Sequence, residues 1–321
     1  MSAEPHAHGA PFGPGSVSLS LYPHASPPGE QMETLLRQGE LATRSGFDGV
    51  TVAEHHGGFP GYLPNPLQIT GWLLDRMERG WSAPLPLLLP LRSPGLVAEE
   101  VAWLAARHPG RVGLGVAPGY VEDDFTAAGV PFAGRLRRHW DAVGPLLASL
   151  SGKSEGPLAS DAAVAALGGR PVPLVSTAKG PKSVAHAAAS GVGIFPTGFV
   201  DDVHQEIFGR YRAQGGVGPA VIMRWAWLGD AADHIEPYAS QTNVKADRSW
   251  APTQLVPRLV ETTPEALARR LFETFEGSTA TSLSLRFHSP SISPAAIEEQ
   301  ITRVGTEVLP LVRELLAARA V

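Results

Sequence analysis

The amino-acid sequence predicts an α/β protein with the strand and helix count of a (β/α)8 TIM barrel. From residue 17 onward, short apolar segments typical of strands alternate with segments of helical periodicity, and eight such pairs follow one another. Two Rossmann-like halves would alternate in a similar way, but no G-x-G-x-x-G follows a predicted strand and opens a helix. The alternation and the lack of this fingerprint together favour the barrel.

Each predicted strand is short, apolar and bounded by turn residues. In the first, Val17, Leu19 and Leu21 alternate with small or polar residues. The third, SAPLPLLLPL, contains three prolines, which require a local distortion because a closed barrel has no edge strand. The predicted strands span 17–22, 49–54, 82–91, 111–116, 171–176, 192–196, 219–227 and 283–287.

A helix is predicted after every strand. Thr263 and Ser293, each followed by a proline, supply N-caps for the last two helices, and Pro310 predicts a bend in the final one. The predicted helices lie at 28–47, 67–80, 97–105, 134–150, 181–190 and 201–214, and after residues 263 and 293.

The remaining segments are assigned by composition and length. Residues 1–16 are rich in Pro, Gly and Ala without an apolar period, so they are expected to form a flexible leader before a single barrel domain at 17–321. The connections 151–170 and 229–262 are longer than ordinary loops. Long connections on the catalytic rim of a barrel are usually lids or binding loops, and 229–262 is expected to be a lid after strand seven.

The composition excludes several classes of function. A net charge of −5 without basic runs argues against nucleic acid or an anionic membrane as a partner. The absence of cysteine excludes disulfides, thiolate catalysis and zinc–cysteine sites. Neither a signal sequence nor a run of about 18 apolar residues is found, so a cytoplasmic location is expected by default.

Glu54, His55 and His56 follow directly on the second predicted strand, at the end where chemistry gathers in barrels. Adjacent strand residues point to opposite sides, so the two histidines are not expected to face the axis together, which disfavours a metal pair. A metal-hydrolase barrel would also need ligands where the chain has Ser176 and Pro196. The favoured interpretation is one catalytic histidine, with its neighbour or Glu54 fixing local structure. The alternative is two structural histidines bonded to loop backbone.

A second candidate site is VSTAKGPKS, between the fifth strand and a helix that begins near Pro181. The hydroxyls of Ser176 and Thr177, the N–H groups of a helix N-terminus and the charges of Lys179 and Lys182 suit a phosphate. The alternative is an ordinary N-capped turn with solvated lysines. A third candidate is the glycine turn after the fourth strand, which lets the backbone approach a flat ligand.

These stretches together resemble the bacterial luciferase-like flavin monooxygenase family, which includes F420-dependent relatives. AEHH at 53–56, followed by NP at 65–66, is similar to the family's second-strand signature. RVGLGVAPGY, followed by FTAAGVPF and Arg135, is similar to its fourth-strand stretch, and the closing LRFHSPSISPAAIEEQITRVGTEVLPLVR is also similar. The resemblance extends over most of 17–316 and implies a luciferase-like barrel.

The resemblance implies roles for residues at matching positions. His55 takes the place of the active-site histidine near the reactive edge of the flavin. The family's bulged third strand places a cis peptide bond at Leu85–Pro86, against which the flavin ring packs. Pro118 stands where many members have a second phosphate-binding arginine.

The predicted site divides into three sets of residues. His55 is assigned to proton transfer, and no metal site is expected. The cofactor is assigned to Leu85, Pro86, Ala117, Gly119, Arg135, Ser176, Thr177, Lys179 and Gly180, and the substrate to Tyr22, Trp225 and His288. Trp225 and Trp227 share a face of their strand and either line the substrate pocket or pack against the outer helices.

The implied function is that of a monooxygenase which uses reduced FMN and O2 to oxygenate a small organic substrate. A separate flavin reductase would supply the reduced FMN, because the sequence shows no second dinucleotide-binding unit. An imidazole titrates near ~6.5, so His55 is suited to move a proton at neutral pH. Two alternatives stay open, namely F420-dependent hydride transfer and a non-catalytic flavin-binding barrel. The sequence determines neither the substrate nor the oligomeric state, for which a homodimer is an option.

Overall fold

The computed structural model describes residues 9–196, 201–230, 258–289 and 292–319. Its strands are short and run parallel to their neighbours. They are β1 Ser16–Leu21, β2 Gly49–Val52, β3 Trp81–Pro84, β4 Leu87–Leu88, β5 Leu114–Ala117, β6 Leu174–Ser176, β7 Gly193–Ile194, β8 Val221–Leu228, β9 Arg258–Glu261 and β10 Ser282–Arg286.

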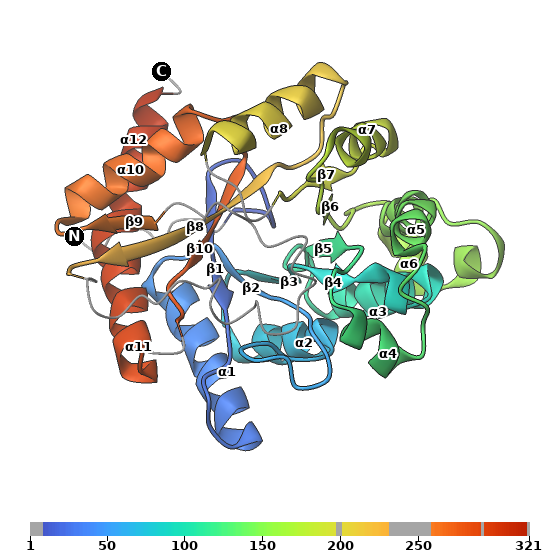
Figure 1. The fold of residues 1–321 in the computed structure, drawn as a ribbon, viewed down its shortest axis with the longest axis horizontal. Helices are drawn as coiled ribbons and strands as arrows, with labels where there is room; N and C mark the ends of the chain where they lie inside the picture. The colour runs from blue at the N-terminus through green and yellow to red at the C-terminus, as the bar shows by residue number, and fades with distance from the viewer. Residues whose placement is uncertain (1–8, 197–200, 231–257, 290–291, 320–321) are drawn as a thin grey trace.

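Helices surround the strands (Figure 1). Many of them begin at a proline, whose fixed φ suits the first helical position. They are α1 Pro28–Ser45, α2 Pro66–Arg76, α3 Pro94–Arg107, α4 Glu122–Ala128, α5 Arg135–Leu150, α6 Ala162–Ala166, α7 Pro181–Ser190, α8 Asp201–Ala213, α10 Pro264–Glu276, α11 Pro294–Arg303 and α12 Leu309–Arg319. Short 3-10 turns lie at Leu89–Leu91 and Gly156–Ser160.

Two sheets make up the barrel wall. The first has the order β3-β2-β1-β10-β8-β9 and the second the order β4-β5-β6-β7. Isolated parallel bridges join them at both junctions, Ser82 with Val112 and Ile194 with Ala220. Because β3 and β4 are the halves of one interrupted strand and β9 is an addition beside β8, the wall has eight strand positions. The predicted (β/α)8 barrel is therefore confirmed.

Strand alternation gives the barrel interior a polar side and an apolar side. In β1 and β10 the valine and leucines belong to the core under the helices, so the serines and Arg286 face inward. A second part of the interior is filled by an apolar cluster of Phe12, Trp81, Ala83, Leu85, Val175, Phe195 and Val221.

The third strand is distorted, as its prolines require. Regular pairing stops after Pro84 and resumes at Leu87, and the Leu85–Pro86 peptide bond between them is cis. The Leu85 N–H donates to the Val52 carbonyl at 2.7 Å, and the Pro86 carbonyl accepts the Glu54 N–H at 3.0 Å. The predicted cis bond is confirmed, and it lies beside the end of β2.

Residues 9–15 pack against the N-terminal end of the barrel. Phe12 is fully buried and meets the Trp81 ring edge-on, with centroids 5.1 Å apart. The Gly15 N–H donates to the Thr281 carbonyl at 2.8 Å. The predicted flexible leader is therefore wrong for residues 9–16, because one aromatic anchor outweighs the Pro- and Gly-rich composition around it. Residues 1–8 lie outside the described residues.

The connection 151–170 does not lie on the catalytic rim. It leads from α5 into β6, so it returns the chain to the N-terminal ends of the strands. It contains α6, which Asp161 caps through the Val164 N–H at 2.8 Å, and Asp161 also accepts from Trp103 Nε1 of α3 at 3.1 Å. This segment thus covers α3 and is not a binding loop at the mouth.

The predicted lid, 229–262, ends in a strand. β9 pairs with the C-terminal half of β8, from Trp225 opposite Arg258 to Leu228 opposite Glu261, so the loop prediction is wrong for 258–261. Residues 231–257 lie outside the described residues. At the end of the chain, a π-helical turn at Val304–Val308 separates α11 from α12. The bend predicted at Pro310 stays a prediction, and the irregularity that the structure records is this π-helical turn just before the proline.

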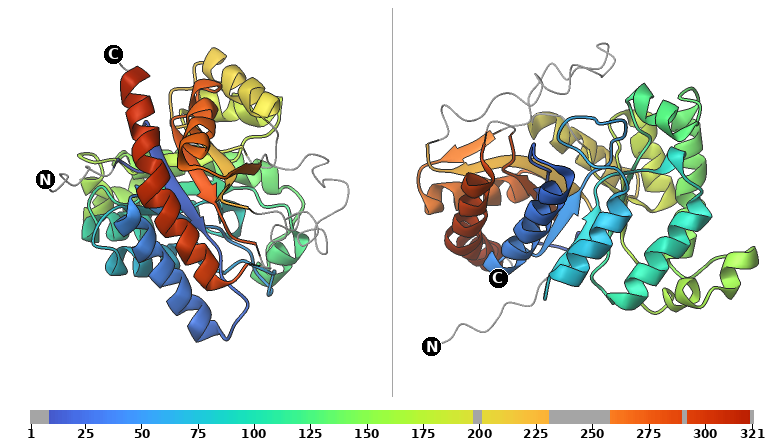
Figure 2. Two further views of the ribbon diagram at one scale, coloured as in Figure 1. Left: turned by 90° about the vertical axis from the view of Figure 1, so that its left-hand side faces the viewer. Right: turned by 90° about the horizontal axis from the view of Figure 1, so that it is seen from below.

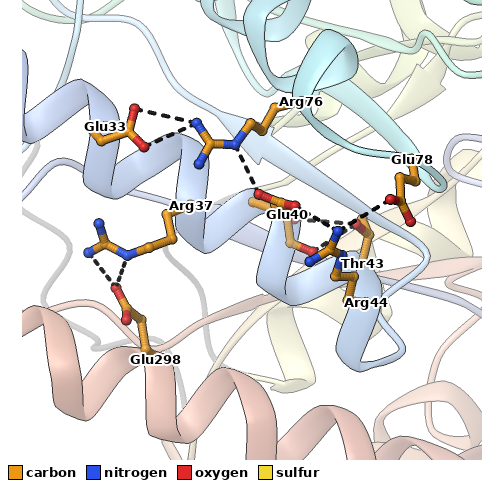
Figure 3. A network of polar contacts seen from close by, with 9 residues as sticks. Glu33, Arg37, Glu40, Thr43, Arg44, Arg76, Glu78 and Glu298 are labelled. Atoms are coloured by element: carbon orange, nitrogen blue, oxygen red, sulfur yellow. Dashed lines mark hydrogen bonds and ion pairs between the residues drawn. The ribbon is translucent and has the colours of Figure 1, made fainter.

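Salt bridges connect α1 to its neighbours on two sides. Arg37 pairs with Glu298 of α11 at 2.8 Å, and Arg76 of α2 pairs with Glu33 at 3.0 Å and with Glu40 at 2.9 Å (Figure 3). The rod formed by α11 and α12 lies along α1 (Figure 2). Because these side chains are largely exposed, each pair contributes little to the stability of the fold.

Candidate active site

Consecutive side chains at the end of β2 point in different directions. His55 is 5% exposed, and its ring stacks on Phe59 with centroids 4.2 Å apart. His56 turns instead to Glu54, with 2.9 Å between Nε2 and Oε1. The prediction that the two histidines would not face one point together is confirmed.

His55 is held between a carboxylate and a phenol. Its Nδ1 lies 2.7 Å from Oδ2 of Asp124, which is fully buried on α4. The other oxygen of Asp124 accepts the backbone N–H of His56 at 2.7 Å. On the far side of the ring, the Tyr120 hydroxyl lies 3.4 Å from Nε2. The β5–α4 connection and the end of β2 thus meet at this histidine.

The surroundings fix where the protons lie. Burial, assisted by the charge of Asp124, raises the pKa of Tyr120 well above its ordinary range, so the hydroxyl keeps its proton. Because Asp124 accepts from Nδ1, we assign the proton of the neutral imidazole to Nδ1. Nε2 then accepts from Tyr120, and it is the ring atom able to take up a proton at the mouth.

Glu54, His56 and Arg92 form a separate ionic group beside His55. Arg92 Nη2 lies 2.7 Å from Glu54 Oε1, and the Leu88 N–H donates to the other oxygen. Burial alone would raise the pKa of Glu54, but the hydrogen bonds from His56 and Arg92 outweigh it and lower that pKa. Glu54 in turn raises the pKa of His56. These contacts tie the end of β2 to β4, so this group holds the loop around His55.

The residues predicted to contact substrate gather around Arg286. Its guanidinium carbon lies 3.7 Å from the centroid of the Tyr22 ring and 5.5 Å from that of Trp225. Its Nε–H donates to the His288 carbonyl at 3.2 Å. The structure therefore brings Tyr22, Trp225 and His288 together, whereas Trp227 packs in the main core.

Tyr62 joins this wall to His55. Its ring centroid lies 4.6 Å from that of His55 and 5.3 Å from that of Tyr22, edge-on in both cases. The residue assigned to proton transfer and those assigned to substrate are thus parts of one mouth.

The residues predicted to face a flat ligand lie on the β3–β5 side. Ala117 pairs with Leu88 at the end of β5. Gly119 has φ of 75°, and a Cβ there would lie 2.8 Å from the Phe125 ring, so the turn requires glycine for its own packing. Leu85 and Pro86 lie on the same side, so the residues predicted to bind the ring system are neighbours in the structure.

Ser176, predicted to contact a phosphate, points outward. Its neighbour Val175 belongs to the interior cluster, so alternation sends Ser176 toward α5. Ser176 is fully buried, and its hydroxyl lies 2.8 Å from Nε2 of His139. Burial lowers the pKa of His139 to about 3, so this imidazole is neutral. In this structure the hydroxyl is not open to a ligand, whereas Thr177, next along the chain, is half-buried.

The turn before α7 presents two backbone donors to one oxygen. The N–H groups of Lys179 and Gly180 both donate to Ser183 Oγ, at 3.1 and 3.0 Å. Burial lowers the pKa of Lys179 to about 7, so an anion beside it would restore its charged form. Lys182 is exposed. Two convergent N–H groups beside a half-buried lysine fit a phosphate, whose oxygen would take the position of the Ser183 hydroxyl.

Arg135 is the first residue of α5. Its guanidinium lies over the Phe132 ring at 3.7 Å, and its Nε–H donates to the Gly119 carbonyl at 3.1 Å. Gly119 follows β5 and Thr177 follows β6, and these strands are neighbours in the sheet. Arg135 thus contacts the end of β5, the strand that neighbours the one leading into the candidate phosphate turn.

Sequence reasoning missed four residues of the site, namely Tyr120, Asp124, His139 and Arg286. Asp124 lies in the acidic run EDD at the start of α4. It could have been found by predicting this short helix, which buries Asp124 alone of the three carboxylates. Arg286 follows Ser282 and Ser284 at alternate positions of β10, so its side chain faces the barrel interior as theirs do. His139 had no sequence signal, because its partner comes from another strand.

Two further findings concern the part of the chain that the structure describes. No helix in it is long and apolar enough to span a membrane. No three of its His, Asp or Glu side chains are grouped so that they would hold a metal ion.

Comparison with known proteins identifies the family. A model described as "Luciferase-like monooxygenase" matches residues 16–225 of the 321. The chain belongs to the luciferase-like monooxygenase family. Its mouth, with His55 at the end of the second strand, is therefore the mouth of a luciferase-like barrel.

Curated relatives of this luciferase-like chain match over shorter stretches. The alkanal monooxygenase alpha chain of Photorhabdus luminescens is 30% identical over 115 residues, which is 36% of this chain and 32% of the relative. The F420-dependent glucose-6-phosphate dehydrogenase of Microbacterium testaceum is 38% identical over 98 residues, which is 29% of each. The matches thus span about a third of the length of these relatives.

Solved structures share the luciferase-like fold over nearly the whole chain. The monooxygenase RslO1 from Streptomyces bottropensis has a TM-score of 0.73 at 19% identity, covering 92% of this chain and 99% of that one. The FMN complex of the oxygenating constituent of 3,6-diketocamphane monooxygenase, from a Pseudomonas putida plasmid, gives 0.70 at 16%, covering 92% and 98%. An F420-dependent secondary alcohol dehydrogenase with an F420–acetone adduct gives 0.69 at 17%, covering 93% and 99%. At these identities the likeness shows the fold.

Proposed function

We propose that this luciferase-like protein is a monooxygenase that uses reduced FMN, supplied by a separate reductase, and O2 to oxygenate a small organic substrate. The observation that carries the proposal is the Tyr120–His55–Asp124 chain at the mouth of a barrel of this family. It provides a proton acceptor whose tautomer is fixed, on rigid elements, where the substrate residues converge.

The flavin, when bound, supplies the redox chemistry, and the protein supplies binding, orientation and proton transfer. Nε2 of His55 accepts a proton at the mouth, and the carboxylate of Asp124 stabilises the imidazolium that results. The Tyr120 hydroxyl, which keeps its proton, donates to whichever acceptor lies beside Nε2. The rings of Phe59 and Tyr62 exclude water from the other faces of the imidazole.

The cofactor is assigned to the wall opposite Arg286. Leu85 and Pro86 would support the ring system, with Ala117 and Gly119 alongside. The phosphate would lie on Thr177, Lys179, Gly180 and Arg135. The fit rests on the convergent N–H groups and on a half-buried lysine whose charged form an anion would stabilise.

F420-dependent hydride transfer is the second candidate. One observation favours it, the F420-dependent relative at 38% identity over 98 residues. Pro118, at the position of a second phosphate-binding arginine, argues against tight FMN binding and so favours the non-catalytic flavin-binding barrel instead. Both candidates use the same mouth, and they differ in whether O2 is a substrate. In either case Nε2 of His55 is the proton acceptor.

Anaerobic titration with reduced FMN and, separately, with reduced F420 tests the proposal. We expect absorbance changes that saturate with reduced FMN, followed on addition of O2 by oxygenation of a substrate from a small-molecule panel. Saturation with F420 alone, and reoxidation only by a carbonyl compound, would establish the second candidate. Flavin binding without turnover of any compound would mean a non-catalytic barrel. Binding of neither cofactor would refute both.

A further inference from the structure

Arg286 places a positive charge on the inner face of the barrel. It is the last residue of β10 and is 5% exposed. The Tyr22 ring covers one face of its guanidinium at 3.7 Å, an arrangement that holds the planar group by a cation–π contact. The guanidinium also donates its Nε–H to the His288 carbonyl at 3.2 Å, which fixes its orientation. Arg286 is thus a positioned cation beside the proposed substrate wall.

His288 gives a second, independent indication of a ligand. Its side chain is 4% exposed, and neither ring nitrogen has a hydrogen-bond partner among the described residues. The ring is stacked on Tyr22 with centroids 5.6 Å apart. Burial, with the charge of Arg286, lowers its pKa to about 2, so it is neutral and has one N–H donor and one acceptor. A buried donor and acceptor without partners imply that a ligand or water satisfies them.

This subsite belongs to the same mouth as His55. Tyr22 contacts Arg286, Tyr62 contacts Tyr22, and His55 contacts Tyr62, each through its ring. Arg286 is also close enough to Tyr120 to oppose the rise in the pKa of that phenol. A ligand anchored on Arg286 would therefore extend toward Nε2 of His55.

We propose that Arg286 and His288 form a carboxylate-binding subsite, and that the substrate is a small carboxylate with an aromatic or apolar body packed on Tyr22 and Trp225. A carboxylate matches the planar fork of a guanidinium, and it accepts the N–H of His288 at the same time. The proposal names the substrate class for the proposed function, and it rests on that function only for the reaction. The binding itself requires neither cofactor nor turnover.

Binding of benzoate and benzamide to the chain without cofactor tests the subsite. The two probes have the same size and differ in charge. A ligand of about nine non-hydrogen atoms binds weakly, so we would use calorimetry and ligand-observed NMR at roughly millimolar concentrations. We expect benzoate to bind at least about ten-fold more tightly than benzamide, because a charge-assisted hydrogen bond contributes roughly that much. Arg286→Gln should remove the difference, and His288→Phe should reduce it.

Two controls separate a lost subsite from a lost fold. Arg37→Gln removes a surface arginine of α1 and should leave the preference for benzoate unchanged. If Arg286→Gln does not fold, Arg286→Lys keeps the charge without the fork and should retain only part of the preference. Equal binding of both probes by the wild-type chain would overturn the proposal. So would loss of benzoate binding when FMN is added, because the anion site would then belong to the cofactor. Neither result bears on whether the chain oxygenates a neutral substrate.

Discussion

Replacing Asp124 with asparagine is expected to reverse the tautomer of His55. Both oxygens of Asp124 accept N–H groups, one from His55 Nδ1 and one from the His56 backbone. Asparagine has one carbonyl oxygen and one NH2 group, and a backbone N–H is always a donor, so the oxygen stays with His56. The NH2 group then faces Nδ1 and donates a hydrogen bond to it. Nδ1 can accept this bond only through its lone pair, that is, when it carries no proton. The ring proton therefore moves to Nε2.

The magnitude follows from the two bonds at Asp124. Both are charge-assisted in the wild-type chain and neutral in the variant, and the difference between such bonds is about 1 kcal/mol each. The free energy of unfolding should therefore fall by about 2 kcal/mol, which leaves a folded protein. The effect on turnover is larger. A protonated Nε2 cannot accept a proton, and loss of general acid–base catalysis costs about 10²–10⁴-fold in rate.

Nitrogen-15 NMR of the histidine rings measures the tautomer directly. The His55 signals are assigned by their loss in His55→Gln. We expect the proton on Nδ1 in the wild-type chain and on Nε2 in Asp124→Asn, with thermal unfolding confirming the fold. Asp123→Asn, an exposed neighbour on α4, is the matched control and should leave the spectrum unchanged. An unchanged tautomer in Asp124→Asn would refute the assignment of the proton acceptor to Nε2.

Three further perturbations test the site and the fold. His55→Ala should lower turnover by about 10²–10⁴-fold with the cofactor dissociation constant unchanged, and full activity in steady-state assays would exclude it from the mechanism. Thr177→Val should weaken cofactor binding about ten-fold in a fluorescence titration, and an unchanged constant would place the phosphate elsewhere. Stability should fall as the pH drops from 7 to 5, because the pKa of His139 is about 3 in the fold and ~6.5 when unfolded, so the unfolded chain binds the extra proton. The loss is ~2 kcal/mol for this residue, and denaturant titrations of His139→Gln should show a smaller slope with pH if the reasoning holds.

The order of elements could be predicted because it is encoded locally. The alternation in β1, the N-caps at Thr263 and Ser293 and the prolines that begin the helices are signals within a few residues of each element. The distortion at Leu85–Pro86 was also local, since prolines cannot complete a central strand.

The misses depend on partners far along the chain. β9 is a strand because β8 extends beyond the barrel and offers it a free edge, which no periodicity in 258–261 reveals. Phe12 is anchored by Trp81, and the outward turn of Ser176 is stabilised by His139 from α5. A shift of one residue in the register of the strand would move the Ser176 side chain from the helix layer to the barrel interior. Composition alone could not predict which side it faces.

The two histidines of the AEHH motif show how one local sequence serves two purposes. Because neighbouring side chains point to opposite sides, His55 contacts Asp124 and His56 contacts Glu54. The two carboxylates have different surroundings. Glu54 receives His56, Arg92 and a backbone N–H, so its charge is balanced and the group is fixed. Asp124 accepts hydrogen bonds from the His55 ring and from the His56 backbone N–H, so its carboxylate lies directly against the imidazole of His55. One histidine of the motif thus faces the substrate wall with a carboxylate behind its ring, while the ion pairs around the other keep the loop in place.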